Sequence, residues 1–137
     1  MQEIINSLFN YAFNHDMEVV YTDKLLPKTR SFADIPTRSI VINANEPNQR
    51  QLPLIIAHEI SHVLQCDTND AKLNFSTALK PHYEQKANIN AIDLLIPFYV
   101  EDKELYQINV DEFMKLFAIP SSLRDICINE MENNINH

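Results

Sequence analysis

The sequence predicts a small α+β domain with a first helix, a short β-sheet and a mostly helical C-terminal half. Three observations lead to this fold class. Apolar residues recur at helical spacing near the N-terminus, two runs rich in β-branched residues follow, and further helical patterns occupy most of the chain after residue 49. The length of 137 residues predicts one domain over residues 1–137.

The N-terminal part is expected to contain one helix and two strands. Apolar residues at positions 4, 5, 8, 9, 12 and 13 predict a helix over about 2–14. The runs 17–22 and 38–43 predict strands, because β-branched side chains favour an extended backbone. Pro27 and Pro36 lie between these runs, so the segment between them is expected to be a loop or an irregular edge strand.

Two long helices are expected in the middle of the chain. Residues 49–66 are apolar on nearly all sides of a helix, which indicates a buried central helix. Pro53 fits its first turns, where a backbone N–H has no partner within the helix. Residues 67–81 lack periodicity and predict a loop, and a second helix is expected over 82–97, stopped by Pro97.

The C-terminal part, residues 98–137, is expected to be helical. A short helix near 98–106 should precede helices over 110–119 and 121–131, which Pro120 separates. Asn109 and Ser121 are the expected N-caps of these last two helices.

The absence of glycine restricts the turns of this chain. Backbone with positive φ must be adopted by other residues, and asparagine and aspartate tolerate it best. The segments 43–45 (NAN) and 69–74 (NDAKLN) are where we expect it.

Composition argues against nucleic-acid and membrane functions. Eleven basic and 19 acidic residues give a net charge of −8, whereas nucleic-acid surfaces are basic. The last two helices resemble a helix–turn–helix, but only Arg124 offers a cation where DNA contacts would begin, so packing on the core is the favoured interpretation. No apolar stretch approaches the roughly 20 residues of a membrane span. Cys66 and Cys127 are expected to be thiols in a reducing cytoplasm.

The buried helix contains three titratable residues: His58, Glu59 and His62. Residues four apart lie on one helical face, so the two imidazoles project the same way, one turn apart. This is the H-E-x-x-H arrangement, in which two histidines bind zinc and the glutamate is a general base. The alternative without a metal is a core helix with two hydrogen-bonded histidines that have a structural role.

A catalytic zinc site needs a third protein ligand and one open position. The candidates are Asp67, Asp70, His82, Glu84 and Asp93. The two aspartates at 67 and 70 follow the helix too closely to return easily. Glu84 is favoured because the next helix can fold back against the first, and His82 is its main rival. Asp93 is expected to face solvent or to make a local hydrogen bond. Glu84 could instead be an exposed acid near a helix start.

Supporting residues are also expected around this site. Asn88 lies one turn after Glu84, where its amide could fix the orientation of a ligating histidine. Glu59 would move a proton from water to the leaving amine. The oxyanion of the reaction needs a donor, for which His82, Tyr83 and Tyr99 are the candidates.

Residues 38–97 resemble the ImmA/IrrE metallopeptidases. The strand Ile40–Asn43 matches the family's I-x-I-N, and Ala57–His62 matches its A-H-E-x-x-H helix. A second block matches at Glu84, Ala87, Asn88, Ala91, Leu94, Leu95 and Pro97. The chain departs from the pattern at Ser61, where the family often has glycine, and at Asn90, where it has phenylalanine.

The resemblance implies a minimal zincin-like fold with one Zn²⁺ per chain. His58, His62 and Glu84 would bind the ion, a gluzincin-like ligand set, and Glu59 would be catalytic. The family implies a phage or mobile-element protein that cleaves a helix-turn-helix repressor in the cytoplasm, without binding nucleic acid or membrane itself. The alternatives are a zinc-containing antirepressor that displaces a repressor by contact, and a general peptide-clearing protease. The strand near 38–43 is expected to be a sheet edge that could bind an extended substrate.

Overall fold

The structure, a computed structural model, describes residues 1–66 and 80–135. It is a small α+β fold, as the sequence predicts. The helices are α1 (Gln2–Asn14), α2 (Leu52–Gln65), α3 (Lys80–Val100), α4 (Val110–Leu116) and α5 (Arg124–Ile135). The strands are β1 (Glu18–Thr22), β2 (Phe32–Asp34) and β3 (Ser39–Asn43), and short 3-10 helices are η1 (Gln49–Gln51), η3 (Leu105–Gln107) and η4 (Ser121–Leu123).

The three strands form one sheet in the order β1-β3-β2. β3 is parallel to β1 and antiparallel to β2, so it has a neighbour on both sides. The expectation that residues 38–43 form a sheet edge is therefore wrong. The short strand β2, in the segment that Pro27 and Pro36 bracket, is an edge strand instead. Its position follows from long-range pairing, which local sequence patterns do not contain.

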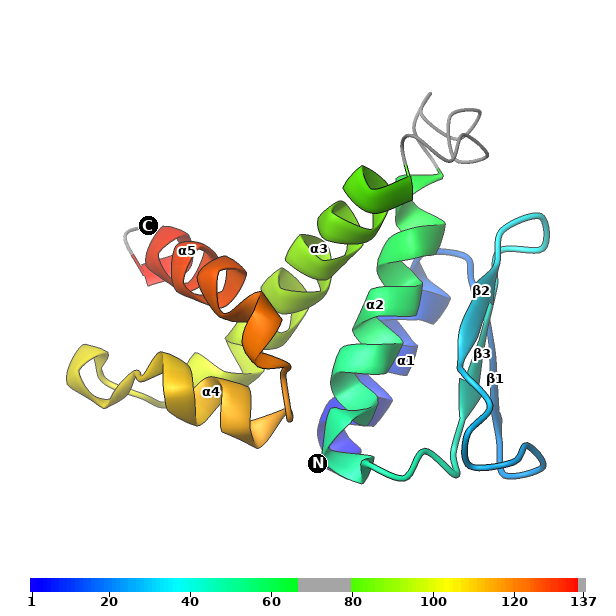
Figure 1. Ribbon diagram of the computed structural model, residues 1–137, viewed down its shortest axis with the longest axis horizontal. Helices are drawn as coiled ribbons and strands as arrows, with labels where there is room; N and C mark the ends of the chain where they lie inside the picture. Colours follow the sequence, from blue (N-terminus) through cyan, green and yellow to red (C-terminus); the bar gives the residue numbers. More distant parts are fainter. Residues whose placement is uncertain (67–79, 136–137) are drawn as a thin grey trace.

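The elements lie in layers (Figure 1). Helices α1 and α2 cover one face of the sheet, α3 packs against α2, and α4 and α5 lie beyond α3. Ile40 and Ile42 on β3 are fully buried, and so are Ile56 and Ile60 on α2. These side chains join sheet and helices in one apolar core, which places α2 at the centre of the fold. No helix in the described part of the chain has the length and apolarity that crossing a bilayer requires.

The end of α3 differs from its prediction. The helix continues through Pro97 to Val100, although proline lacks the N–H that would bond one turn back. Pro97 is exposed, while Ile96 and Tyr99 on either side of it are buried, so packing stabilises the helix across the proline. The short helix expected near 98–106 is consequently reduced to this extension and to η3.

The predicted caps of the last helices have different outcomes. The Asn109 side chain accepts hydrogen bonds from the backbone N–H groups of Asp111 and Glu112, which confirms it as the N-cap of α4. Ser121 lies inside η4 and is not a cap, because the chain makes a 3-10 turn before α5 begins.

Positive φ occurs at Asp16, Arg38, Asp102 and Ala118 among the described residues. The two aspartates agree with the expectation for a chain without glycine. The segment 43–45 does not adopt positive φ, and 69–74 lies outside the described residues, as does most of the loop expected over 67–81. The Arg38 side chain donates a hydrogen bond to the carbonyl of His15 at 2.6 Å, which helps to hold its turn in the costly left-handed region.

Candidate metal centre

Helix α2 presents its polar side chains from within an apolar element. Ile56, Ala57, Ile60 and Ser61 are fully buried, whereas His58, Glu59 and His62 keep some exposure. The Ser61 hydroxyl donates a hydrogen bond to the Ala57 carbonyl at 2.8 Å. This bond satisfies the buried hydroxyl, so serine is accommodated where the related family often has glycine.

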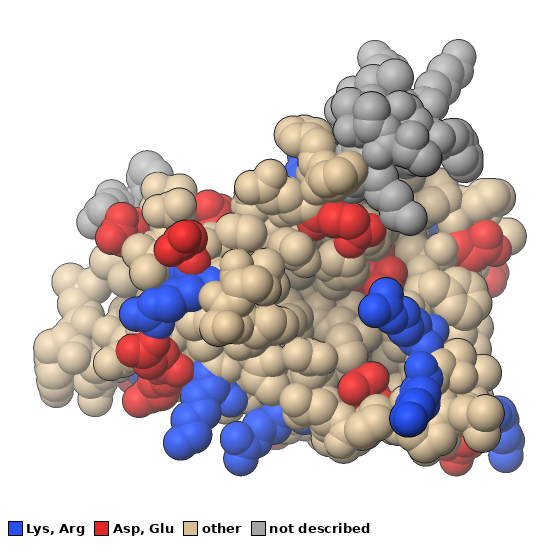
Figure 2. All heavy atoms as spheres, in the orientation of Figure 1, with Lys and Arg blue, Asp and Glu red and all other residues tan. Residues whose placement is uncertain are grey.

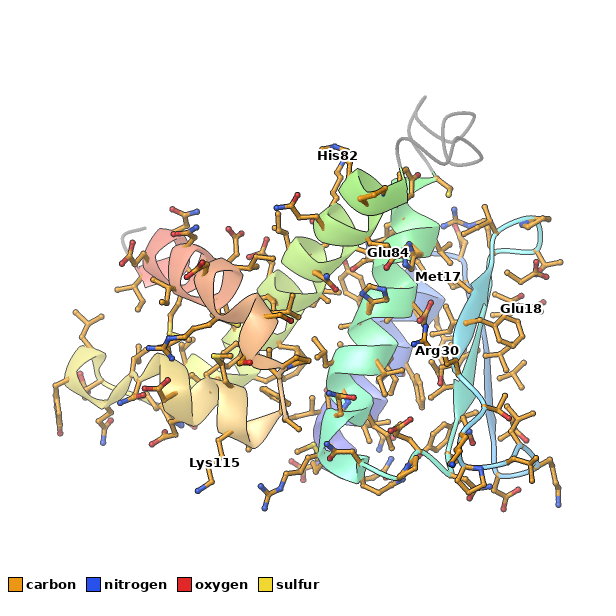
Figure 3. The ribbon with its side chains drawn as sticks, viewed as in Figure 1. Met17, Glu18, Arg30, His82, Glu84 and Lys115 are labelled. Atoms are coloured by element: carbon orange, nitrogen blue, oxygen red, sulfur yellow. The ribbon has the colours of Figure 1, made fainter. Side chains whose placement is uncertain are left out.

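His58 and His62 converge with Glu84, which α3 brings against α2 (Figure 3). The His58 Nε2 atom lies 3.1 Å from Glu84 Oε2, and His62 Nε2 lies 3.3 Å from Glu84 Oε1. The two Nε2 atoms are 3.0 Å apart. The Glu84 side chain is 48% exposed and the histidines much less, so the cluster opens toward solvent on the Glu84 side.

These three residues fit a tetrahedral metal ion. They are the group of histidine, cysteine and acidic residues in the described ranges whose ligand atoms all lie within 4.8 Å of one another. Zinc bonds of about 2.0–2.1 Å place tetrahedral ligand atoms about 3.3 Å apart, close to the separations observed here. Two imidazole nitrogens and one carboxylate also leave a fourth position free for water or substrate. The donor set suits zinc, and the geometry identifies a candidate metal centre.

Electrostatics at the centre favour the protonation states that a metal site needs. Burial, and secondarily the charge of His58, lowers the pKa of His62, which keeps its imidazole in the neutral form that binds cations. Burial, and secondarily the charge of Glu84, raises the pKa of Glu59 to about 8. A cation held by the cluster would oppose this rise, because it stabilises the carboxylate. A bound cation would therefore favour the carboxylate form of Glu59, which can accept a proton.

The comparisons with known proteins agree with this geometry. A model of the peptidase M78 family, described as an IrrE N-terminal-like domain, matches residues 12–122. The chain belongs to this family. No curated protein and no solved structure matches the chain significantly. Membership confirms the ImmA/IrrE resemblance and, together with the cluster of two histidines and one glutamate, supports a metallopeptidase type of function.

Of the other candidate ligands, His82 and Asp93 lie in the described part of this M78 chain, and neither belongs to the cluster. His82 is exposed at the start of α3 and points away from Glu84 (Figure 3). Asp93 is partly buried and interacts with Glu130 and Asn134 of α5, so in place of solvent or a local hydrogen bond it has partners distant in the sequence. Asp67 and Asp70 lie outside the described residues.

The predicted supporting residues have different surroundings. Tyr83 lies beside the cluster, its ring parallel to that of His62 with centroids 6.4 Å apart. Asn88 is partly buried one turn after Glu84, and within the described ranges it makes no hydrogen bond to His58 or His62. Tyr99 lies about four turns farther along α3 than Glu84. It is buried, and its hydroxyl bonds to Glu112 and to the N–H of Asn109, which anchors α4 and not the metal centre.

The sequence did not lead us to predict the structural role of Asn43, which holds the segment before β2 against the end of β3. Asn43 is fully buried at the end of β3, and its side-chain amide donates hydrogen bonds of 2.8 Å to the carbonyls of Leu26 and Thr29. Its own N–H donates to the Ser31 hydroxyl at 2.9 Å. An asparagine that continues a run of buried strand residues was the available signal, because a buried amide must find such partners.

Proposed function

We propose that this M78 protein is a zinc-dependent endopeptidase that hydrolyses a peptide bond in a regulatory protein. The observation that carries the proposal is the convergence of His58, His62 and Glu84 beside the partly buried Glu59. His58, His62 and Glu84 would hold one Zn²⁺. When bound, the ion supplies a Lewis acid and makes water nucleophilic near neutral pH.

The chain's own residues supply the proton transfers. Glu59 would accept a proton from the attacking water and deliver it to the nitrogen of the leaving amine, because it is next to the ligand His58 and a bound cation would favour its carboxylate form. His58 and His62 would remain neutral ligands. Tyr83, whose ring lies against His62, is the residue that we propose as a donor to the developing oxyanion.

We propose a helix-turn-helix repressor of a phage or mobile element as the substrate, by analogy with the ImmA/IrrE resemblance. The net charge of −8 suits a basic, DNA-binding partner in electrostatic terms. The reaction would take place in the cytoplasm, where the free thiols Cys66 and Cys127 would stay reduced.

An extended substrate segment could pair with the outer edge of β2. β3 has both edges occupied, so strand addition must use an end strand of the sheet, and β2 contacts α2. Substituting Ala33 by proline in the middle of β2 would weaken substrate binding if this edge is used. Unchanged binding by the folded variant would contradict the pairing.

The decisive variant is Glu59→Gln. It should keep the metal ligands and bind one Zn²⁺ per chain, yet lose cleavage of a co-expressed repressor encoded beside its gene. Zinc content would be measured by atomic emission and cleavage by mass spectrometry of the intact repressor. A Glu59→Gln protein that cleaves as fast as the parent would refute the mechanism.

The contact-only antirepressor is the second candidate. The short segment with η3 exposes two large side chains, Leu105 at 69% and Tyr106 at 85%, which would suit contact with a partner protein. If the protein is a contact-only antirepressor, Glu59→Gln should relieve repression as well as the parent does. Substitution of Tyr106 should then abolish relief while any peptidase activity remains.

A further inference from the structure

Arg30 is an exposed cation on the face of the molecule that carries the metal centre. It lies between β1 and β2, one residue before Ser31 and two before the edge strand begins. Figure 3 shows its side chain reaching from this segment toward α2, on the side where Glu84 is labelled. Figure 2, in the same orientation, shows basic and acidic side chains exposed on this face of the molecule. Within residues 1–66 and 80–135, Arg30 makes no hydrogen bond or ion pair.

The backbone on both sides of Arg30 is held in place. The Asn43 side-chain amide donates hydrogen bonds to the carbonyls of Leu26 and Thr29, and the Asn43 backbone N–H donates to the Ser31 hydroxyl. Thr29 and Ser31 are the neighbours of Arg30 in the sequence, so a fully buried side chain and a strand end fix the point from which the arginine projects. A fixed backbone reduces the entropy lost when the side chain binds a ligand. An ordinary surface arginine has no such support.

The chain as a whole carries a net charge of −8, so Arg30 is one of 11 basic residues against 19 acidic ones. Because its guanidinium makes no ion pair with the described residues, it remains available to a negatively charged ligand. Its planar donors match a carboxylate, which they can bind through two parallel hydrogen bonds. The position before β2 would place that carboxylate beside a peptide paired with the β2 edge.

We propose that Arg30 is a specificity-determining residue that binds a carboxylate of the substrate near the scissile bond. The inference rests on the proposed peptidase function and deepens it by naming acidic peptide segments as the preferred class. The carboxylate belongs to an internal aspartate or glutamate in the endopeptidase proposed above. A free C-terminus has the same chemistry, and the test below separates the two sources.

The first measurement is binding and needs no cleavage. Immobilised, zinc-loaded Glu59→Gln protein would select from an equimolar library of ten-residue peptides. Each acidic peptide in the library has an asparagine or glutamine twin, and each sequence is present with a free and an amidated C-terminus. Mass spectrometry of the bound fraction gives the enrichment of each twin. We expect acidic twins to be enriched about 10-fold or more, whether or not the C-terminus is amidated.

The matched comparison uses two variants in the Glu59→Gln background, Arg30→Gln and Lys28→Gln. Lys28 is exposed in the same segment, so its substitution removes the same charge and alters the long-range field similarly. We expect Arg30→Gln to abolish the selectivity and Lys28→Gln to preserve it. Arg30→Glu should reverse the preference toward lysine-containing peptides. Equal enrichment of both twins by the Glu59→Gln protein, or equal effects of the two substitutions, would overturn the inference. Selectivity that depends only on a free C-terminus would overturn the internal-carboxylate assignment.

The second measurement is cleavage of the same library by the zinc-loaded parent. We expect acidic residues to be enriched near the cleaved bonds, and Arg30→Gln to raise KM for those peptides with little change in kcat. Acid-selective binding without any cleavage would refute the proposed peptidase function and leave Arg30 as a ligand-binding residue. Cleavage without acid preference would refute the inference about Arg30 and leave the peptidase intact.

Discussion

Asp93 makes the stability of the protein depend on pH through its contact between α3 and α5. The pKa of Asp93 is raised from 3.8 to about 7, mainly by burial. A hydrogen bond with Glu130 and the charge of Glu130 also contribute to this rise, and a hydrogen bond with Asn134 opposes it. Its Oδ1 atom is buried without a hydrogen bond to any described residue. The native protein therefore holds this proton more tightly than the unfolded chain does. The stabilising contribution is complete below pH 3.8 and is lost as the pH rises through 7.

Asp93→Asn removes this dependence. For a fully buried group, pKa values of about 7 and 3.8 would correspond to about 4 kcal/mol of free energy at high pH. Asp93 is only partly buried, so solvent screening reduces the expected gain of the variant to about 1–2 kcal/mol at pH 8. At pH 5 the native carboxyl is mostly protonated, and the gain should fall to less than about half of that value.

The assay is urea denaturation of the parent and of Asp93→Asn at pH 5 and pH 8, followed by far-ultraviolet circular dichroism. Glu132→Gln is the control, because Glu132 is an exposed acid on the same helix, α5. The control should change the free energy of unfolding by less than about 0.5 kcal/mol at both pH values. A variant that is less stable than the parent at pH 8, or whose gain is the same at pH 5, would refute the reasoning.

Three further predictions concern the metal centre and its support. Glu84→Gln should weaken zinc binding by more than about 100-fold in a chelator competition, whereas Glu101→Gln at an exposed acid should not. Saturating zinc, at about 100 times Kd, should stabilise the parent by about 2.7 kcal/mol, seen as a rise in Tm that chelation reverses; an unchanged Tm would exclude a folded-state site. Asn43→Ala should lower the free energy of unfolding, measured by urea denaturation, by about 2–3 kcal/mol, because it leaves the carbonyls of Leu26 and Thr29 without these hydrogen bonds. A decrease below about 0.5 kcal/mol, the range of ordinary surface substitutions, would contradict this.

Local patterns in the sequence determined much of this protein. The apolar spacing predicted α1 with its observed bounds, and the proline and apolar run predicted α2 as a buried helix. The i, i+4 spacing placed His58 and His62 on one face, and Asn109 correctly predicted the start of α4 as its N-cap. These features depend on residues within one or two helical turns of each other, so a reading of neighbouring residues suffices.

Only the tertiary structure decided how distant segments meet. It placed β3 between its two neighbours, carried α3 past Pro97, and brought Glu84, not His82, to the histidines. It also joined Asn43 to the segment around Arg30. Strand order, helix packing and the convergence of side chains depend on burial summed over the whole core, and residues far apart in the sequence contribute to that sum together.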